Sequence, residues 1–266
     1  MGSQMKRWLS LLLLVACGAS AAEVCQPVRV GYSDRERVPY YMGNGSEVPD
    51  QPGVLVELFR EAFRSVGCPV VLVRLPVARV RLALVSGAID IAPADTPDER
   101  HAGYVVATTA NGAVDRKRAL AITAYVFVRS EDKLSPATDP MQYFKNHTLA
   151  ANQGTLLAAQ LKAAGLQMDD GSFSSWNNFD KLRLKRVDGF TLALMTPTAL
   201  DAYLQARYDR QLMRLDKPVR NSYMWLGANR AYYQQHRARM EAVWNWLGAR
   251  GAQEVDAMTR RYAAAP

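Results

Sequence analysis

The chain has few of the residues that bind metal ions. Only three of its 266 residues are histidine and three are cysteine. The histidines, His101, His147 and His236, are scattered and have no histidine or cysteine neighbour at the spacing of a zinc site. No motif pairs a nucleophile with a base either. We therefore expect neither a metal centre nor a cofactor.

Long apolar runs are missing beyond the first 22 residues. Residues 6–7 are basic, residues 8–16 are apolar, and residues 19–21 read Ala-Ser-Ala, an arrangement typical of a signal peptide and its cleavage site. The apolar run is too short to span a bilayer. We expect residues 1–22 to be removed and the protein to be periplasmic. The sequence before Cys17 resembles a bacterial lipobox, so lipid attachment there is the alternative.

Acidic residues are outnumbered by basic ones, 25 to 33, which gives a net charge of +8. Two of the cations, Lys6 and Arg7, belong to the expected signal peptide, so the mature chain keeps +6. The arginines are spread along the chain and form no basic-helix, zinc-finger or RNP pattern, which argues against nucleic-acid binding. Anionic small molecules or an acidic cell surface suit this charge better.

Two cysteines remain in the mature chain, an even number in an oxidising compartment. Cys25 precedes an apolar run at 28–32, and Cys68 precedes a second at 70–75. If both runs are parallel neighbouring strands, their first residues lie within reach of a disulfide. We predict a structural bridge between Cys25 and Cys68.

Strand and helix patterns alternate along the chain, which predicts an α/β fold. A first round comprises the ranges 28–32, 54–66, 70–75, 76–86 and 88–92. A strand-like run at 119–128 follows, and a second round then comprises 148–151, 156–164, 178–186, 187–194 and 197–208. The chain then continues with a strand at 223–227 and two closing helices at 234–247 and 252–262.

Two polar turns follow predicted strands, where open α/β sheets place their ligands. The first carries Thr96 and Arg100, and a guanidinium can bind a carboxylate through two charge-assisted hydrogen bonds. The second carries Gly154 and Thr155 before a helix, whose free N–H groups and dipole favour an anion. Each motif has a plainer explanation, since arginine is usually exposed and threonine is a common N-cap.

Together these motifs resemble periplasmic solute-binding proteins of the polar amino-acid ABC transporter type, the bacterial extracellular solute-binding protein family 3. The matching features are S-G-x-I-D, a strand and T-P-x-E-R in the first half, and the Gly-Thr turn in the second. The resemblance implies an α/β, two-lobe, type II fold with two hinge crossings. Lobe 1 would comprise residues 23–120 and 226–266, and lobe 2 residues 121–225. Thr96, Arg100, Gly154 and Thr155 would hold a solute carboxylate.

The resemblance implies further ligand contacts. Tyr40 or Tyr41 follows the first strand, where a flat ring covers the solute in the family, although either ring could instead pack its own loop. Arg79 lies in the first turn of a helix on the expected cleft side, where an exposed arginine with no ligand is the alternative.

One position departs from the family pattern. Met195 stands where the family's aspartate binds the solute's ammonium group. A buried ammonium without a carboxylate partner is costly. We therefore expect a solute that lacks an α-amino group, or one whose amine is matched by Asp34 or Asp201. Because Arg37, like Arg79 and Arg100, is cationic, an anionic solute suits the site better.

Three functions are compatible with this pattern. The first is a monomeric binding protein that delivers a small carboxylate-bearing solute to the membrane subunits of an ABC importer. The second is an enzyme on the same scaffold, similar to cyclohexadienyl dehydratase, which needs a general acid near Arg100. Asp34, Glu57, Asp95 and His101 are near in sequence, but none lies in a motif. The third is a sensory partner of a membrane receptor.

Overall fold

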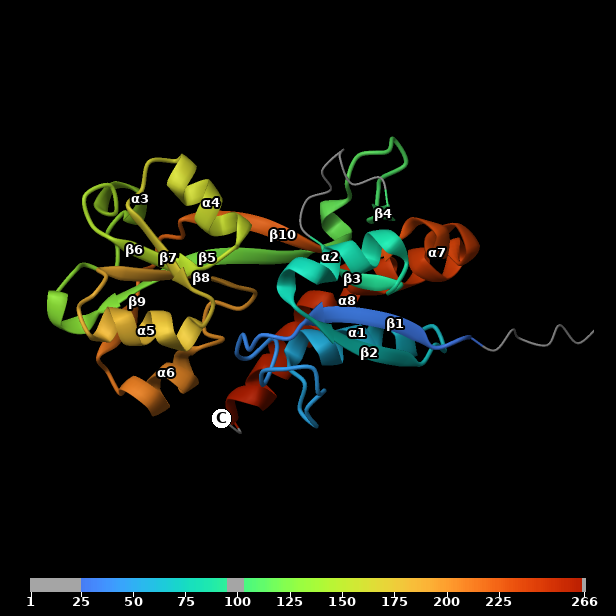
Figure 1. The fold of residues 1–266 in the computed structure, drawn as a ribbon, viewed down its shortest axis with the longest axis horizontal. Coiled ribbons are helices and arrows are strands. Elements are labelled where there is room, and N and C mark those ends of the chain that lie inside the picture. The colour runs from blue at the N-terminus through green and yellow to red at the C-terminus, as the bar shows by residue number, and fades with distance from the viewer. Residues whose placement is uncertain (1–24, 95–102, 265–266) are drawn as a thin grey trace, which may run out of the picture.

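The computed structural model describes residues 25–94 and 103–264, which form two bodies side by side (Figure 1). The expected signal peptide with Cys17, and the turn with Thr96 and Arg100, lie outside the described residues. The strands are β1 (Val28–Ser33), β2 (Val70–Leu75), β3 (Ile91–Ala94), β4 (Tyr104–Val105), β5 (Leu120–Arg129), β6 (Leu149–Asn152), β7 (Met168–Ser172), β8 (Gly189–Leu194), β9 (Leu212–Arg214) and β10 (Arg220–Asn229). The α-helices are α1 (Val54–Arg64), α2 (Val77–Ser86), α3 (Pro140–Tyr143), α4 (Leu156–Ala163), α5 (Ser175–Arg183), α6 (Asp201–Tyr208), α7 (Arg230–Gln235) and α8 (Arg237–Ala264). Two short 3₁₀ helices, η1 (Arg116–Arg118) and η2 (Ser130–Asp132), flank β5.

The described strands join in one sheet of order β2-β1-β3-β10-β5-β8-β6-β7, with β4 beside β10 and β9 beside β5. In the first half of the sheet, β1 runs parallel to β2 and β3, and β10 is antiparallel to β3. In the second half, β6 runs parallel to β7 and β8, and β5 is antiparallel to β8. The two halves therefore repeat one strand pattern.

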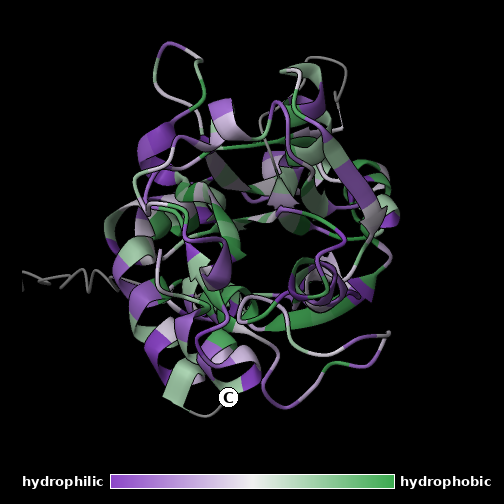
Figure 2. Ribbon diagram, turned by 90° about the vertical axis from the view of Figure 1, so that its left-hand side faces the viewer, coloured by the Kyte–Doolittle hydropathy of each residue, from purple (hydrophilic) through white to green (hydrophobic). Residues whose placement is uncertain are grey.

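Helices cover both faces of each half. In the first half α2 contacts β1, β3 and β10, while α1 and α8 pack together on the opposite face. In the second half, Phe127 and Phe190 on neighbouring strands pack edge-on against Phe179 of α5, with centroids 5.2 and 4.8 Å away. Figure 2 shows the consequence, with hydrophobic strands inside and hydrophilic residues on the outer helices. Because apolar surface is removed from water, this layering stabilises the fold.

Two long strands connect the halves. Residues 220–224 of β10 pair with β5, and from Trp225 onward β10 pairs with β3 instead. One strand thus contributes to both halves of the sheet. The chain crosses between the halves along β5 and β10 (Figure 1).

The disulfide between Cys25 and Cys68 is confirmed, with the two Cα atoms 5.1 Å apart. The register of β1 and β2 explains it, because Val28 lies opposite Val70 and places the residues before both strands side by side. The parallel neighbours expected from the sequence are present.

The end of the chain differs from the prediction. Two closing helices were expected, but α8 is one helix of 28 residues. Its glycines do not end it. A Cβ at Gly248 would lie 2.7 Å from the Lys117 oxygen, and one at Gly251 2.9 Å from Leu120 Cδ2. The glycines therefore allow α8 to lie close against η1 and β5.

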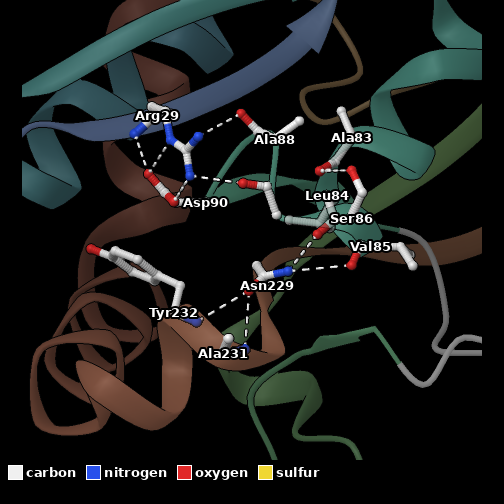
Figure 3. A network of polar contacts seen from close by, with 11 residues as sticks. Arg29, Ala83, Leu84, Val85, Ser86, Ala88, Asp90, Asn229, Ala231 and Tyr232 are labelled. Carbon is white, nitrogen blue, oxygen red and sulfur yellow. Dashed lines mark hydrogen bonds and ion pairs between the residues drawn. The ribbon is translucent and has the colours of Figure 1, made fainter.

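The strand expected at 88–92 begins later, as β3 at Ile91, because the residues before it form a turn that binds Arg29. The guanidinium of Arg29 bonds both carboxylate oxygens of Asp90 and the carbonyls of Gly87 and Ala88, at 2.6 to 3.1 Å (Figure 3). This contact fixes β1 to the turn that leads into β3.

A second side chain in Figure 3, Asn229, joins two helices. Its amide nitrogen donates to the Leu84 carbonyl at the end of α2 at 2.8 Å. Its oxygen accepts from the backbone of Ala231 and Tyr232 at the start of α7, at 3.0 and 3.1 Å. One buried residue thus satisfies both helix ends, which otherwise lack partners.

Asn229→Ala should lower the free energy of unfolding by about 2 kcal/mol, because a helix cap is lost and the buried Leu84 carbonyl is left without this donor. Urea denaturation measures the change. The matched control is Asn177→Ala, an exposed asparagine in α5, which should change stability by less than about 0.5 kcal/mol. Equal losses in both variants would contradict the assigned role.

Candidate functional site

The loop that follows β1 bridges the two halves of the molecule. Arg37 donates from Nη2 to the Ala193 carbonyl at 2.7 Å. The hydroxyl oxygen of Tyr40 accepts from the Met195 backbone N–H at 2.6 Å. The Ala193 carbonyl belongs to the end of β8, and the Met195 N–H belongs to the turn after it. The carboxyl end of β1 therefore meets the carboxyl end of β8, where ligands bind in α/β folds.

Two more contacts extend this bridge. Trp176 of α5 donates its indole N–H to Glu36 at 3.0 Å. The guanidinium carbon of Arg35 lies 5.9 Å from the centre of the Phe173 ring, whose side chain is 55% exposed. Loop 34–41 thus binds the second half through backbone, indole and ring contacts together.

The bridge buries both tyrosines that the sequence proposed as solute-stacking rings. Tyr40 is fully buried, and burial raises the pKa of its phenol, so the hydroxyl is neutral at physiological pH. Arg37 lies over its ring, 5.3 Å from the centroid. Tyr41 is 6% exposed, with its ring 5.7 Å from that of Tyr32. In this arrangement both rings pack within the protein, and their contact with a solute stays a prediction.

Tyr40→Phe should lower the free energy of unfolding by about 1 to 3 kcal/mol, because the Met195 N–H loses its acceptor. Tyr32→Phe is the matched control. Tyr32 is equally buried, yet among the described residues its hydroxyl has no hydrogen-bond partner. Its removal should cost less than about 0.5 kcal/mol. Chemical denaturation of both variants decides, and a larger loss in Tyr32→Phe would contradict the assignment.

The predicted Gly154-Thr155 turn lies between β6 and α4. Gly154 has a φ of +73°, a conformation that favours glycine, and a Cβ there would meet nothing within 4 Å. Thr155 is the N-cap of α4, with its oxygen accepting from Ala158 at 3.2 Å and its hydroxyl donating to Asn152 at 2.9 Å. The plainer explanation of this threonine is therefore present, and its contact with a carboxylate stays a prediction.

A buried polar network fixes this turn to α5. Asn178, fully buried, donates to the side chain of Asn152 at 2.9 Å, and Asn152 donates to Ser175 at the same distance. The sequence analysis missed these residues. A signal existed, since Asn178 lies among the apolar positions of its helix, where an asparagine needs hydrogen-bond partners.

One methionine and two aspartates bear on whether the site could bind a solute amine. Met195 is half-buried and packs against the main hydrophobic core. Asp34 directly follows β1, and one of its carboxylate oxygens is buried without a hydrogen bond from any described residue, although Arg35 lies 3.7 Å away. Asp201 is an exposed residue in the first turn of α6. Of the two carboxylates, Asp34 is the one at a strand end.

Arg79 is exposed in the first turn of α2, at the carboxyl end of β2. Thr96 and Arg100, on which the predicted anion site depends most, lie outside the described residues.

Within the part of the chain that the structure describes, no group of three or more His, Cys, Asp or Glu could hold a metal ion, and no helix is long and apolar enough to cross a membrane.

No family model matches the sequence, and no curated protein matches it. Solved structures do. The GluR0 ligand-binding core in complex with L-glutamate has a TM-score of 0.68 at 15% identity and covers 90% of this chain and 99% of its own. The ABC transporter substrate-binding protein AbpA from Streptococcus pneumoniae, bound to L-arginine, has a TM-score of 0.63 at 14% identity, covering 90% and 95%.

A histidine kinase sensor domain with similarity to periplasmic binding proteins has a TM-score of 0.64 at 14% identity, and covers 88% of this chain and 96% of its own. At such low identity the likeness concerns the fold. The expected fold class is confirmed: this chain has the two-lobe α/β fold of periplasmic solute-binding proteins.

Proposed function

We propose that this protein is an extracytoplasmic solute-binding protein that closes its two lobes on a small carboxylate-bearing solute. The observation that carries the proposal is the bridge from loop 34–41 to the end of β8. It brings together the strand ends at which such folds bind ligands. A solute that contacts both strand ends would add to these bonds and stabilise the closed form.

The lobes we propose are residues 23–120 with 226–266, and residues 121–225. The change of partner along β10, from β5 to β3 at Trp225, supports a boundary close to 225. Opening and closing would then bend β5 and β10 at the crossings, as in hinge motions of other two-lobe proteins.

The solute carboxylate would be held by Arg100 and Thr96 on one side and by the Gly154-Thr155 turn on the other. The amino end of α4 adds a favourable dipole for an anion. Arg37, already at the inter-lobe contact, adds positive charge. This set suits an anion better than a zwitterion, because Met195 offers no charge to an ammonium group.

The partner would be either the membrane subunits of an ABC importer or a membrane-bound sensor. The structural neighbours include both a transporter substrate-binding protein and a histidine kinase sensor domain. In either case a closed monomer presents both lobes to the membrane partner.

The test is a binding screen of the purified protein by thermal shift and then calorimetry. The compounds are the standard amino acids, keto acids, dicarboxylates and aromatic acids. We expect an amine-free acid to raise the melting temperature and to bind at about micromolar affinity. No stabilisation by any carboxylate would contradict the proposal.

If a standard amino acid binds tightly and amine-free acids do not, the result supports solute binding but refutes the interpretation of Met195. Asp34→Asn is then the next variant. Loss of amino-acid binding in it, with Asp201→Asn unaffected, would assign the amine to the carboxylate beside β1.

A further inference from the structure

A groove of about 810 Å³ lies between α1 and the second half of α8, and it shares no residue with the bridge. It is lined by Glu61, Arg64 and Ser65 of α1 and by Trp246, Arg250, Glu254, Ala257, Met258, Arg260, Arg261 and Ala264 of α8. Each α8 position has another three or four residues away, so together they form one broad face of the helix. From Trp246 to Ala264 this face is about 27 Å long at the helical rise.

The rims of the groove present positive charge. In each ion pair along it, the arginine side chain is more exposed than its acid. The exposed fractions are 78% and 36% for Arg64 and Glu61, 59% and 25% for Arg250 and Glu254, and 65% and 28% for Arg261 and Glu57. Each guanidinium group has five N–H donors, so its single carboxylate partner leaves donors unused.

Arg260 adds to this charge. It is exposed, and it forms no ion pair or hydrogen bond with any residue between 25–94 or 103–264. With Glu57, the partner of Arg261, counted beside the lining residues, four arginines stand against three glutamates, and Arg260 is the excess charge. The groove therefore carries an unbalanced positive charge that an acidic partner would neutralise.

Apolar side chains lie among the polar residues that line the groove. Trp246 and Ala257 are half-buried, and Met258 is buried. Arg250 lies over the Trp246 ring, 6.0 Å from its centroid. A tryptophan and arginines around a concave surface are the residues that carry most of the energy in protein interfaces.

We propose that this groove docks an acidic, amphipathic segment of a protein partner. Its length matches a helix of several turns, its arginines match acidic side chains, and Trp246 and Ala257 offer contacts to apolar ones. A compact anion would use one arginine and leave Trp246 and Ala257 uncovered. A membrane surface is flat on this scale and would touch the rims only. The inference does not depend on the proposed solute site.

The probe is a fluorescent 18-residue peptide with leucine on one helical face and glutamate elsewhere. Two control peptides carry lysine in place of glutamate, or the same residues in scrambled order. The groove variant is Arg250→Glu with Arg260→Glu. Its matched control is Arg81→Glu with Lys162→Glu, exposed cations of α2 and α4 that change the net charge equally. Thermal unfolding checks that all variants fold.

We expect the acidic peptide to bind the parent protein and the control variant with equal affinity. It should bind the groove variant at least tenfold more weakly, and its affinity for the parent protein should fall as the salt concentration rises. The lysine and scrambled peptides should bind at least tenfold more weakly. No binding of the acidic peptide, equal loss in both variants, or equal binding of the scrambled peptide would overturn the proposal. So would binding to phosphatidylglycerol vesicles without binding to the peptide.

Discussion

An unfolding free energy about 4 kcal/mol below that of the parent chain is expected when Cys25 and Cys68 are both replaced by alanine. The bridge joins residues 43 positions apart, so its removal frees a long loop in the unfolded chain. Both cysteines are buried, at 8% and 4% exposure, which adds a small packing loss. Urea denaturation of parent and double variant measures the difference.

Reduction of the parent protein is the control for this variant. Under a strong thiol reductant the parent should approach the stability of the double variant, while the double variant should not change. A loss below about 1 kcal/mol would mean that the unfolded chain keeps these segments close without the bridge.

Arg100→Ala should weaken binding of the solute found in the screen by about 2 to 5 kcal/mol, which is roughly 30-fold to 5,000-fold. The reason is the loss of a planar, bidentate charge partner for the carboxylate. Arg100→Lys should recover only part of it, since an ammonium group cannot reproduce the fork of two donors. Calorimetry measures all three proteins.

The control is Arg81→Ala, an exposed arginine of α2 at which we expect unchanged affinity. Unchanged affinity in Arg100→Ala would remove the central claim about the T-P-x-E-R motif. Arg100 lies outside the described residues, so its role rests on the sequence motif, and this experiment tests that motif.

Much of the fold follows from local patterns. The apolar spacing of residues 54–66 predicted α1, and the β2 bounds were predicted as observed. The single helix α8 could not be predicted, because Gly248 is explained only by the close approach of Lys117, far away in the chain. The strand β7 was missed as well. Its residues, Met-Asp-Asp-Gly-Ser, have no strand propensity, and pairing with β6 holds them extended.

The inter-lobe bridge shows why only part of the candidate site could be predicted. Glu36 and Trp176 are 140 residues apart, so no local pattern connects them. At Met195 the sequence analysis considered the side chain, whereas the hydrogen bond to Tyr40 uses the backbone N–H. A backbone donor is present whatever residue occupies the position, and sequence alone does not reveal its partner.

The packing of α8 against α6 has a practical consequence for building a fluorescent reporter. Near the end of α8, the Tyr262 carbonyl accepts a buried hydrogen bond from the Tyr203 hydroxyl of α6, at 2.8 Å. Its start, at Arg237, lies at the opposite end of the helix, beside α7 (Figure 1). A dye on a cysteine placed at Ala264 would sense any displacement of α6, while the same dye at Arg237 would serve as its internal reference. The pair would convert lobe movement into an optical ratio without a labelled solute.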